Sequence, residues 1–162
     1  MKHWNKEIAK EVYPQITIKI TKEDVVGILS SALNGGINYW GEVDYRPEVY
    51  NKTHDWLKEN AKPDYEDGEI CYEEVLAQML FDGKEIIVKD KEADDGSGIY
   101  HLSLKELTAG IAATHSLGYY YDYNWLVPDG RSGNWRLEAS QIDAEVADTI
   151  IQCALFWDVI YG

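Results

Sequence analysis

The sequence KEIIVKDKEADDGSGIYHLS, residues 84–103, sets the architecture from which the rest of the chain can be interpreted. A β-branched run at 84–90 precedes an acidic, glycine-containing turn at 91–98, and a second run follows at 99–103. Two such runs around a polar turn are typical of a β-hairpin. Residues 104–116 then carry apolar side chains at helical spacing, and Ser103 opens this segment with a capping box. We therefore predict a hairpin that leads directly into a helix.

The segments before the hairpin predict further alternation of strands and helices. Residues 15–20 (QITIKI) alternate apolar and polar side chains, as a half-buried strand does. Residues 22–34 carry an apolar stripe that ends at two glycines, which predicts a helix with a glycine C-cap. A short β-branched and aromatic run at 37–40 (INYW) is a candidate second strand, and residues 70–81 predict an amphipathic helix.

Two stretches carry weaker signals. Residues 41–68 are irregular and highly charged, with one or two helical turns expected at 54–60 (HDWLKEN). Residues 118–140 predict a second long connection, rich in tyrosine, glycine and tryptophan. Connections of this length are either functional or partly mobile.

The last predicted helix, 141–161, is unusual because it is apolar almost all round from Ile150 to Ile160. The pattern Ser140-x-x-Asp143 at its start resembles a capping box. A helix that is apolar on every side is either buried in its own chain or forms half of a homodimer interface. The sequence leaves both alternatives open.

This element order indicates an α+β fold, with a small, mainly antiparallel sheet of about four strands covered by about four helices. The 162 residues are expected to form a single domain, because domains usually run to about 100–200 residues. With 45% apolar residues, the chain can bury a substantial core without a disulfide or a metal.

The chain is strongly acidic, with 15 lysines and arginines against 29 aspartates and glutamates, a net charge of −14. Residues 42–95 carry a net charge of −10, from 7 basic and 17 acidic side chains. Such a surface repels nucleic acids and membranes and attracts basic protein surfaces, including the channels of nucleases and polymerases. The simpler interpretation is that the acids only maintain solubility.

Motifs of known chemistry are missing from the sequence. It holds no phosphate-binding glycine loop, no HExxH motif and no histidine pair at ligand spacing. The acidic run 90–96 fails the register of a calcium loop. Cys71 and Cys153 lie in apolar helical patterns, and residues 1–11 lack a signal-peptide core, so we expect a reduced, cytoplasmic protein. We predict no catalytic residue, no cofactor and no metal site, and hence no enzyme. The open alternative is an enzyme of unrecognised type, which would need His101, His115 or a carboxylate cluster to converge in one cleft.

Two regions supply candidate partner-binding residues: the acids of the middle third and the tyrosine-rich sequence GYYYDYNW at 118–125. Tyrosine is favoured where one end of the ring stays in water, and it is enriched at interfaces. Each region also has an ordinary interpretation, as a solvated turn or as a loop that buries its own rings. The candidate residues are Asp64, Glu66, Asp67, Asp94, Asp95, Tyr119, Tyr120 and Tyr121.

The segments 20–25 (ITKEDV), 32–40 (ALNGGINYW) and 147–162 (ADTIIQCALFWDVIYG) resemble a family of small acidic proteins encoded in bacteriophage and prophage genomes. The resemblance carries over no catalytic residue. It implies an accessory protein of a phage, acting in the cytoplasm of the host bacterium, with a counter-defence, anti-CRISPR-like role.

Charge and resemblance together predict a protein that binds and inhibits a basic host or defence enzyme acting on nucleic acids, such as a CRISPR effector. One alternative is a small-ligand binder or nucleotide sponge, in which the tyrosine loop and Trp40 stack a base. An anionic ligand would then need Arg131, Arg136 or Lys105 to converge on it. The other alternative is a structural or regulatory phage protein without a defence role.

Overall fold

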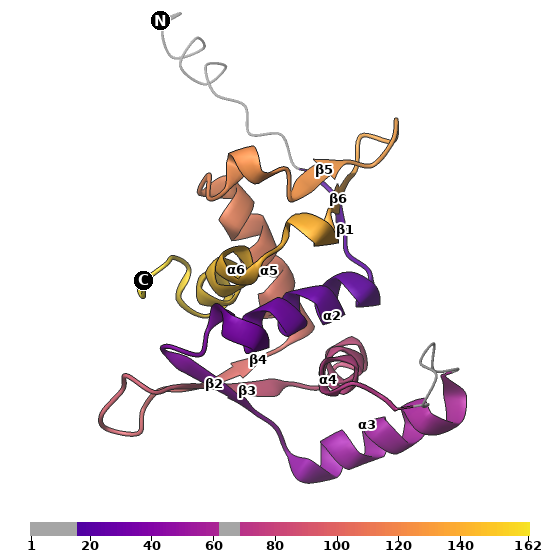
Figure 1. The fold of residues 1–162 in the computed structure, drawn as a ribbon, viewed down its shortest axis with the longest axis vertical. Coiled ribbons are helices and arrows are strands. Elements are labelled where there is room, and N and C mark those ends of the chain that lie inside the picture. The colour runs from indigo at the N-terminus through magenta and orange to yellow at the C-terminus, as the bar shows by residue number, and fades with distance from the viewer. Residues whose placement is uncertain (1–15, 62–68) are drawn as a thin grey trace, which may run out of the picture.

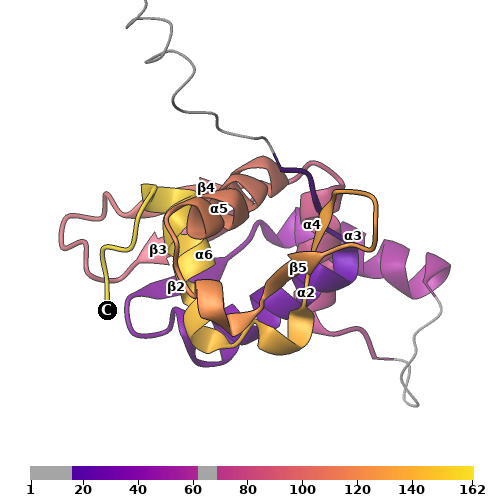
Figure 2. The same ribbon diagram turned by 90° about the horizontal axis from the view of Figure 1, so that it is seen from above.

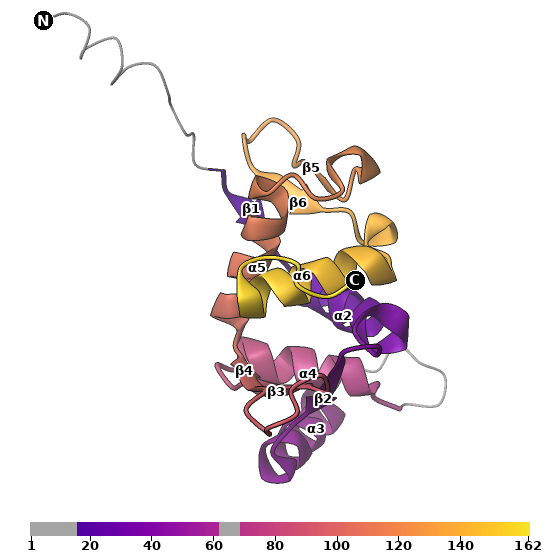
Figure 3. The ribbon, with the colours of Figure 1, turned by 90° about the vertical axis from the view of Figure 1, so that its left-hand side faces the viewer.

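The computed structural model describes residues 16–61 and 69–162. Helices lie between two small sheets along the long axis of the molecule (Figure 1), and a view from the side shows the same layers (Figure 3). The chain is thus a mixture of helices and strands, as an α+β fold requires. The strands form two three-stranded sheets, where the sequence predicted one sheet of about four strands.

The first sheet has the order β2-β3-β4 and is antiparallel throughout. It contains the predicted hairpin, because β3 (Ile86–Asp90) pairs with β4 (Ile99–Leu102) across the acidic turn. Its third strand, β2 (Gly41–Asp44), pairs with β3 on the other side. Val88 of the central strand faces the core and is fully buried.

The second sheet joins distant parts of the chain. Strand β1 (Ile18–Lys19) runs parallel to β6 (Trp135–Leu137), which pairs antiparallel with β5 (Leu126–Pro128). The predicted connection at 118–140 therefore contains two strands, besides the single turn η2 (Tyr121–Tyr123). Each of these strands has three residues, which is too short for a recognisable alternation.

Three helices form the central layer: α2 (Lys22–Ser31), α5 (Leu104–Ser116) and α6 (Ala144–Phe156). Seen from above, α5 and α6 lie side by side (Figure 2), and Gly110 is their point of close approach. Below them, α4 (Tyr72–Phe81) packs on α2 and on α3 (Pro47–Asn60). The buried apolar side chains of these layers form one contiguous cluster.

The helix starts follow the local sequence closely. Thr21 and Ser103 each make a complete capping box, with Asp24 and Glu106 respectively. The start of α6 is different, because Asp143 is its N-cap and accepts a hydrogen bond from the Val146 N–H at 3.0 Å. The predicted capping box at Ser140 is therefore wrong. Ser140 lies in the short turn η3 (Ala139–Gln141).

Residues 37–40 do not form the predicted strand. The helix α2 continues into a wide π-type turn, η1 (Ala32–Gly36), and the N–H groups of Trp40 and Gly41 both bond to the Ile37 carbonyl. Burial of Ile37 and Trp40 explains why the run is apolar without being extended. The predicted strand at 15–20 is reduced to two residues within its described part.

Helix α3 was underpredicted, since only its last two turns were expected. Pro47 is its first residue, where proline is tolerated because the missing N–H would be unpaired anyway. Only Thr53 and Leu57 of this helix are buried, so the apolar signal is weak. Because most of the helix surface is charged and exposed, its sequence lacks the apolar periodicity that predicts a helix.

Helix α6 ends at Phe156 rather than at 161. Trp157 has a positive φ of 64°, and residues 158–162 turn back along the helix. Every residue from 146 to 154 is buried within this one chain. Burial accounts for the apolar composition of α6 without a second copy, so that composition gives no evidence for a homodimer.

Within residues 16–61 and 69–162, no helix combines the length and the apolar character needed to cross a membrane.

Candidate functional site

A cavity of about 600 Å³ opens between the π-type turn η1, the first half of α6 and the C-terminal segment 158–162. Its wall brings together residues that are far apart in the sequence. The residues that line it are Gly35, Gly36, Tyr39, Tyr120, Ala144, Glu145, Asp148, Thr149, Val159, Ile160, Tyr161 and Gly162.

Asp148 is the central polar group of this wall, and only 9% of it is exposed. Its Oδ1 atom accepts hydrogen bonds from Trp40 Nε1 at 2.7 Å and from Gln152 Nε2 at 3.0 Å. Its Oδ2 atom accepts one from the Tyr39 hydroxyl at 2.7 Å. Among the described residues, no lysine, arginine or histidine forms an ion pair with this carboxylate.

Gln152 holds the C-terminal segment in place and so builds the opposite wall. The side chain is fully buried, and its Oε1 atom accepts hydrogen bonds from the N–H groups of Ile160 and Tyr161, both at 2.8 Å. Its Nε2 atom donates to the Tyr161 carbonyl at 3.1 Å. One amide thus supplies hydrogen-bond partners for the backbone of residues 160 and 161, which lie beyond the end of the helix.

Tyr161 connects this segment to the core and to the hairpin. Its ring stacks on Trp40, with the ring centres 5.3 Å apart, and its hydroxyl donates to Asp90 at 2.6 Å. The hydrogen bond to Asp90 raises the pKa of Tyr161 to about 12. Burial, with Asp148 as a further cause, raises the pKa of Tyr39 to about 12. Both phenols therefore remain neutral hydrogen-bond donors at neutral pH.

The charge of the cavity wall is negative. Glu145 and Asp148 line it, and none of its described lining residues is lysine, arginine or histidine. Arg131, Arg136 and Lys105, which an anionic ligand would require, are not among them. A phosphate in this cavity would face two carboxylates with no counter-charge, whereas a cation would be attracted.

The predicted partner-binding residues fall into three groups. Asp64, Glu66 and Asp67 lie outside the described residues. Asp94 and Asp95 are exposed in the turn between β3 and β4, and hydrogen bonds from Ser97 lower the pKa of Asp95. That turn and the C-terminal segment lie on the same side of the molecule, at the left in Figures 1 and 2.

The three tyrosines have different environments. Tyr120 lines the cavity and receives a hydrogen bond from Thr149 at 3.4 Å. Tyr119 lies beside the C-terminal segment, where its hydroxyl donates to Asp158 at 2.6 Å. Tyr121 is 82% exposed and lines no described cavity. Of the five candidate residues that the structure describes, Tyr120 lines the cavity and the other four do not.

Four residues of the site were not predicted from the sequence: Tyr39, Glu145, Asp148 and Gln152. One signal could have found two of them, because Asp148 and Gln152 are four residues apart in a mainly apolar helix. That spacing places both polar groups on the same face of the helix. Nothing local indicates that Tyr39 would meet them.

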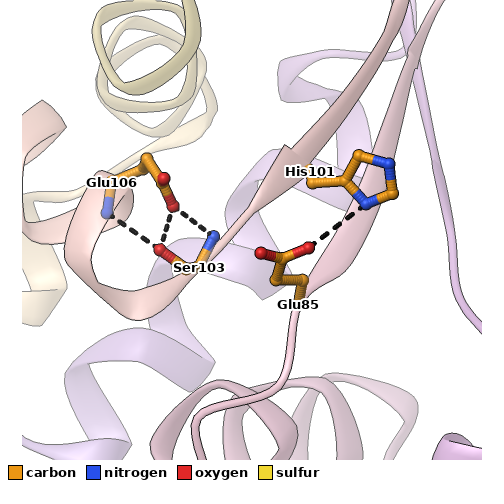
Figure 4. Close-up of polar contacts among 4 residues, drawn as sticks. All are labelled: Glu85, His101, Ser103 and Glu106. Atoms are coloured by element: carbon orange, nitrogen blue, oxygen red, sulfur yellow. Dashed lines mark hydrogen bonds and ion pairs between the residues drawn. The ribbon is translucent and has the colours of Figure 1, made fainter.

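A second polar cluster surrounds the start of α5, and it has structural roles. His101 Nδ1 lies 3.3 Å from Glu85, while the Ser103 hydroxyl bonds to Glu106 in the capping box. Figure 4 shows the two pairs directed apart, so Ser103 has no histidine beside it that could act as a base. Within residues 16–61 and 69–162, no three His, Cys, Asp or Glu side chains gather as metal ligands would.

Comparison of the chain with protein-family models, with curated proteins and with solved structures finds no match.

Proposed function

We propose that this protein binds a partner protein that presents a basic surface. The observation that carries the proposal is the cavity wall, which is lined by three tyrosines and by the carboxylates of Glu145 and Asp148 and has no described cationic side chain. The exposed acids of the β3–β4 turn, on the same side of the molecule, extend the negative surface beyond the cavity.

The partner class that we propose is an enzyme that acts on nucleic acids, because such enzymes carry basic channels for phosphate backbones. An acidic protein seated on that channel competes with the nucleic acid and inhibits the enzyme. The resemblance to small acidic phage proteins supports a host or defence enzyme as the target, with a CRISPR effector as the leading example. In this proposal the protein acts in the cytoplasm of the host bacterium.

Small-ligand binding is the second candidate, because the cavity volume falls within the range of about 300–1,000 Å³ that is usual for ligand sites. Its lining argues against a nucleotide as that ligand, since the phosphates would meet Glu145 and Asp148 without a counter-charge. A structural or regulatory role in the phage is the remaining alternative.

The test is a pull-down in which the immobilised protein is incubated with a bacterial lysate containing guide-loaded CRISPR effectors. The column is washed at low and then at high salt, and retained proteins are identified by mass spectrometry. We expect a nuclease or polymerase to be retained at low salt and released at high salt, because contacts between exposed charges are screened by ions. The nucleic-acid binding of that enzyme is then measured with and without the protein.

Two charge-matched variants sharpen the test. Asp94→Asn/Asp95→Asn removes two acids from the proposed face, and Asp55→Asn/Glu59→Gln removes two exposed acids from α3. We expect only the first variant to weaken retention. Equal effects of the two variants would point to non-specific charge attraction, and retention that is insensitive to salt would contradict the proposal.

A further inference from the structure

We infer that the cavity is an anchor site for an organic cation, and specifically for the guanidinium group of an arginine side chain. The inference rests on the proposed function in one respect, since the partner's basic surface is the source of that arginine. The binding of an arginine peptide to the cavity can be measured without any partner.

Asp148 is a buried carboxylate that has no ion-pair partner among the described residues. A buried carboxylate is normally paired with a cation or a metal, because removing a charge from water is costly. Asp148 is nine-tenths buried and has three neutral donors but no described ion-pair partner. A carboxylate offers about four acceptor positions, so about one remains for a ligand.

Three bases of the chain are engaged with partners that do not line the cavity. Lys89 pairs with Asp44 at 2.8 Å, and Arg136 with Glu138 at 3.0 Å. Lys91 donates to the carbonyl of Asn38. The counter-charge that would complete the cavity is therefore not supplied by these side chains.

The shape of the cation follows from the side chains that line the cavity. Tyr39 and Tyr120 line it together with two carboxylates, and Tyr39 is half exposed. A planar guanidinium stacks on aromatic rings, offers five donors in a fork and is less strongly hydrated than an ammonium group. These properties favour arginine over lysine. The volume of about 600 Å³ also leaves room for the residues that flank the arginine.

The experiment uses two peptides that differ only in charge, acetyl-Gly-Arg-Gly-amide and acetyl-Gly-citrulline-Gly-amide. Binding is followed by NMR through the indole N–H signal of Trp40, because that group donates to Asp148. We expect a saturable shift with the arginine peptide, with a dissociation constant on the order of 1 mM for a single anchor. The citrulline peptide should bind at least about tenfold more weakly, since it lacks the charge.

Matched variants identify the site. Glu145→Gln removes an exposed carboxylate of the lining, and Glu23→Gln removes an exposed carboxylate from the first turn of α2. Both positions lie in a first helical turn, so their effects on folding should be similar and small. We expect Glu145→Gln to weaken arginine binding severalfold and Glu23→Gln to leave it unchanged. Asp148→Asn is the stronger test where circular dichroism shows that it folds.

Equal shifts with both peptides would overturn the inference. The absence of a saturable shift at an arginine-peptide concentration of about ten times the expected dissociation constant would overturn it as well. This outcome differs from failure of the proposed function. If arginine binds but no basic enzyme is retained from the lysate, the anchor site stands and the proposed function falls. If an enzyme is retained and neither the arginine peptide nor Glu145→Gln has an effect, the anchor is wrong and the partner surface lies elsewhere.

Discussion

Gln152 is a polar side chain whose partners come from three separate segments of the chain. It bonds to Asp148 one helical turn away, to the Tyr39 hydroxyl at 3.3 Å, and to the backbone of residues 160 and 161. An amide suits this position because it supplies both donors and an acceptor. In the described part of the chain, no buried side-chain nitrogen or oxygen lacks a hydrogen-bond partner. At the residue scale, the site is thus an ordered polar network inside an apolar helix layer.

We expect Gln152→Leu to destabilise the protein by about 2 kcal/mol or more, because it keeps the volume but leaves polar groups without partners. The N–H groups of Ile160 and Tyr161 lose their acceptor, and Asp148 loses one of its three donors. Urea unfolding measures the change. Gln78→Leu is the control, since Gln78 makes only an exposed bond to Asp82. Equal losses in the two variants would show that the buried network contributes nothing specific.

Helices α5 and α6 pack closely against each other at Gly110. A Cβ atom at Gly110 would lie 2.6 Å from the Cβ of Ala154 and 2.6 Å from the Ile150 carbonyl oxygen. Backbone atoms cannot move aside as a flexible side chain can. At the scale of elements, the absence of a side chain at Gly110 therefore allows α6 to pack close to α5. Helix α6 in turn carries several of the residues that line the cavity.

Gly110→Ala and Gly27→Ala should have opposite effects on stability. Alanine is the better helix former by about 1 kcal/mol, and a Cβ at Gly27 in α2 would have no neighbour within 4 Å. We therefore expect Gly27→Ala to stabilise by about 0.5–1 kcal/mol. Gly110→Ala should destabilise by about 1–2 kcal/mol, since overpacking outweighs the gain in propensity. The urea concentration at the midpoint of unfolding measures both changes, provided that the m-value stays constant. Stabilisation by Gly110→Ala would contradict the close packing.

Tyrosine contacts hold the molecule together at several places between its layers. Tyr39 faces α6, Tyr161 joins the C-terminal segment to β3, and Tyr72 of α4 packs against Tyr45 and Tyr50. Burial, reinforced by neighbouring Tyr45 and Tyr50, raises the pKa of Tyr72 to about 12. At the scale of the whole molecule, folding thus favours the protonated state of three phenols, those of Tyr39, Tyr72 and Tyr161, which lie at different contacts between elements.

Stability should consequently fall in alkaline solution. An unfolded tyrosine titrates near pH 10, whereas Tyr39, Tyr72 and Tyr161 titrate at about 12 in the folded protein. Above about pH 10 the unfolded chain has released more protons than the folded protein. The contribution of the three phenols to the free energy of unfolding is therefore complete below pH 10 and is lost between about pH 10 and 12. Urea unfolding across this range measures how steeply the free energy of unfolding falls with pH. Tyr72→Phe should make that fall less steep. An unchanged dependence on pH would contradict the raised pKa of Tyr72.

Local patterns were sufficient for much of the fold. The hairpin β3–β4, the helices α2, α4 and α5 and the capping boxes at Thr21 and Ser103 lie where the sequence placed them. Each of these features depends on residues close together in the chain, through alternation, helical spacing or a side chain that bonds three positions away. The exposed turn with Asp94 and Asp95 follows from the same kind of signal.

Local patterns did not reveal the cavity, because its contacts join residues that are distant in the chain. Trp40 and Asp148 are separated by 108 positions, and Tyr39 and Asp148 by 109. The parallel pairing of β1 with β6 and the return of the chain after Trp157 are decided in the same way, by contacts between segments that the sequence presents separately. Residues 37–40 illustrate the reason: their apolar character indicates burial, but only the packing of Trp40 against α6 and Tyr161 determines that they turn rather than extend.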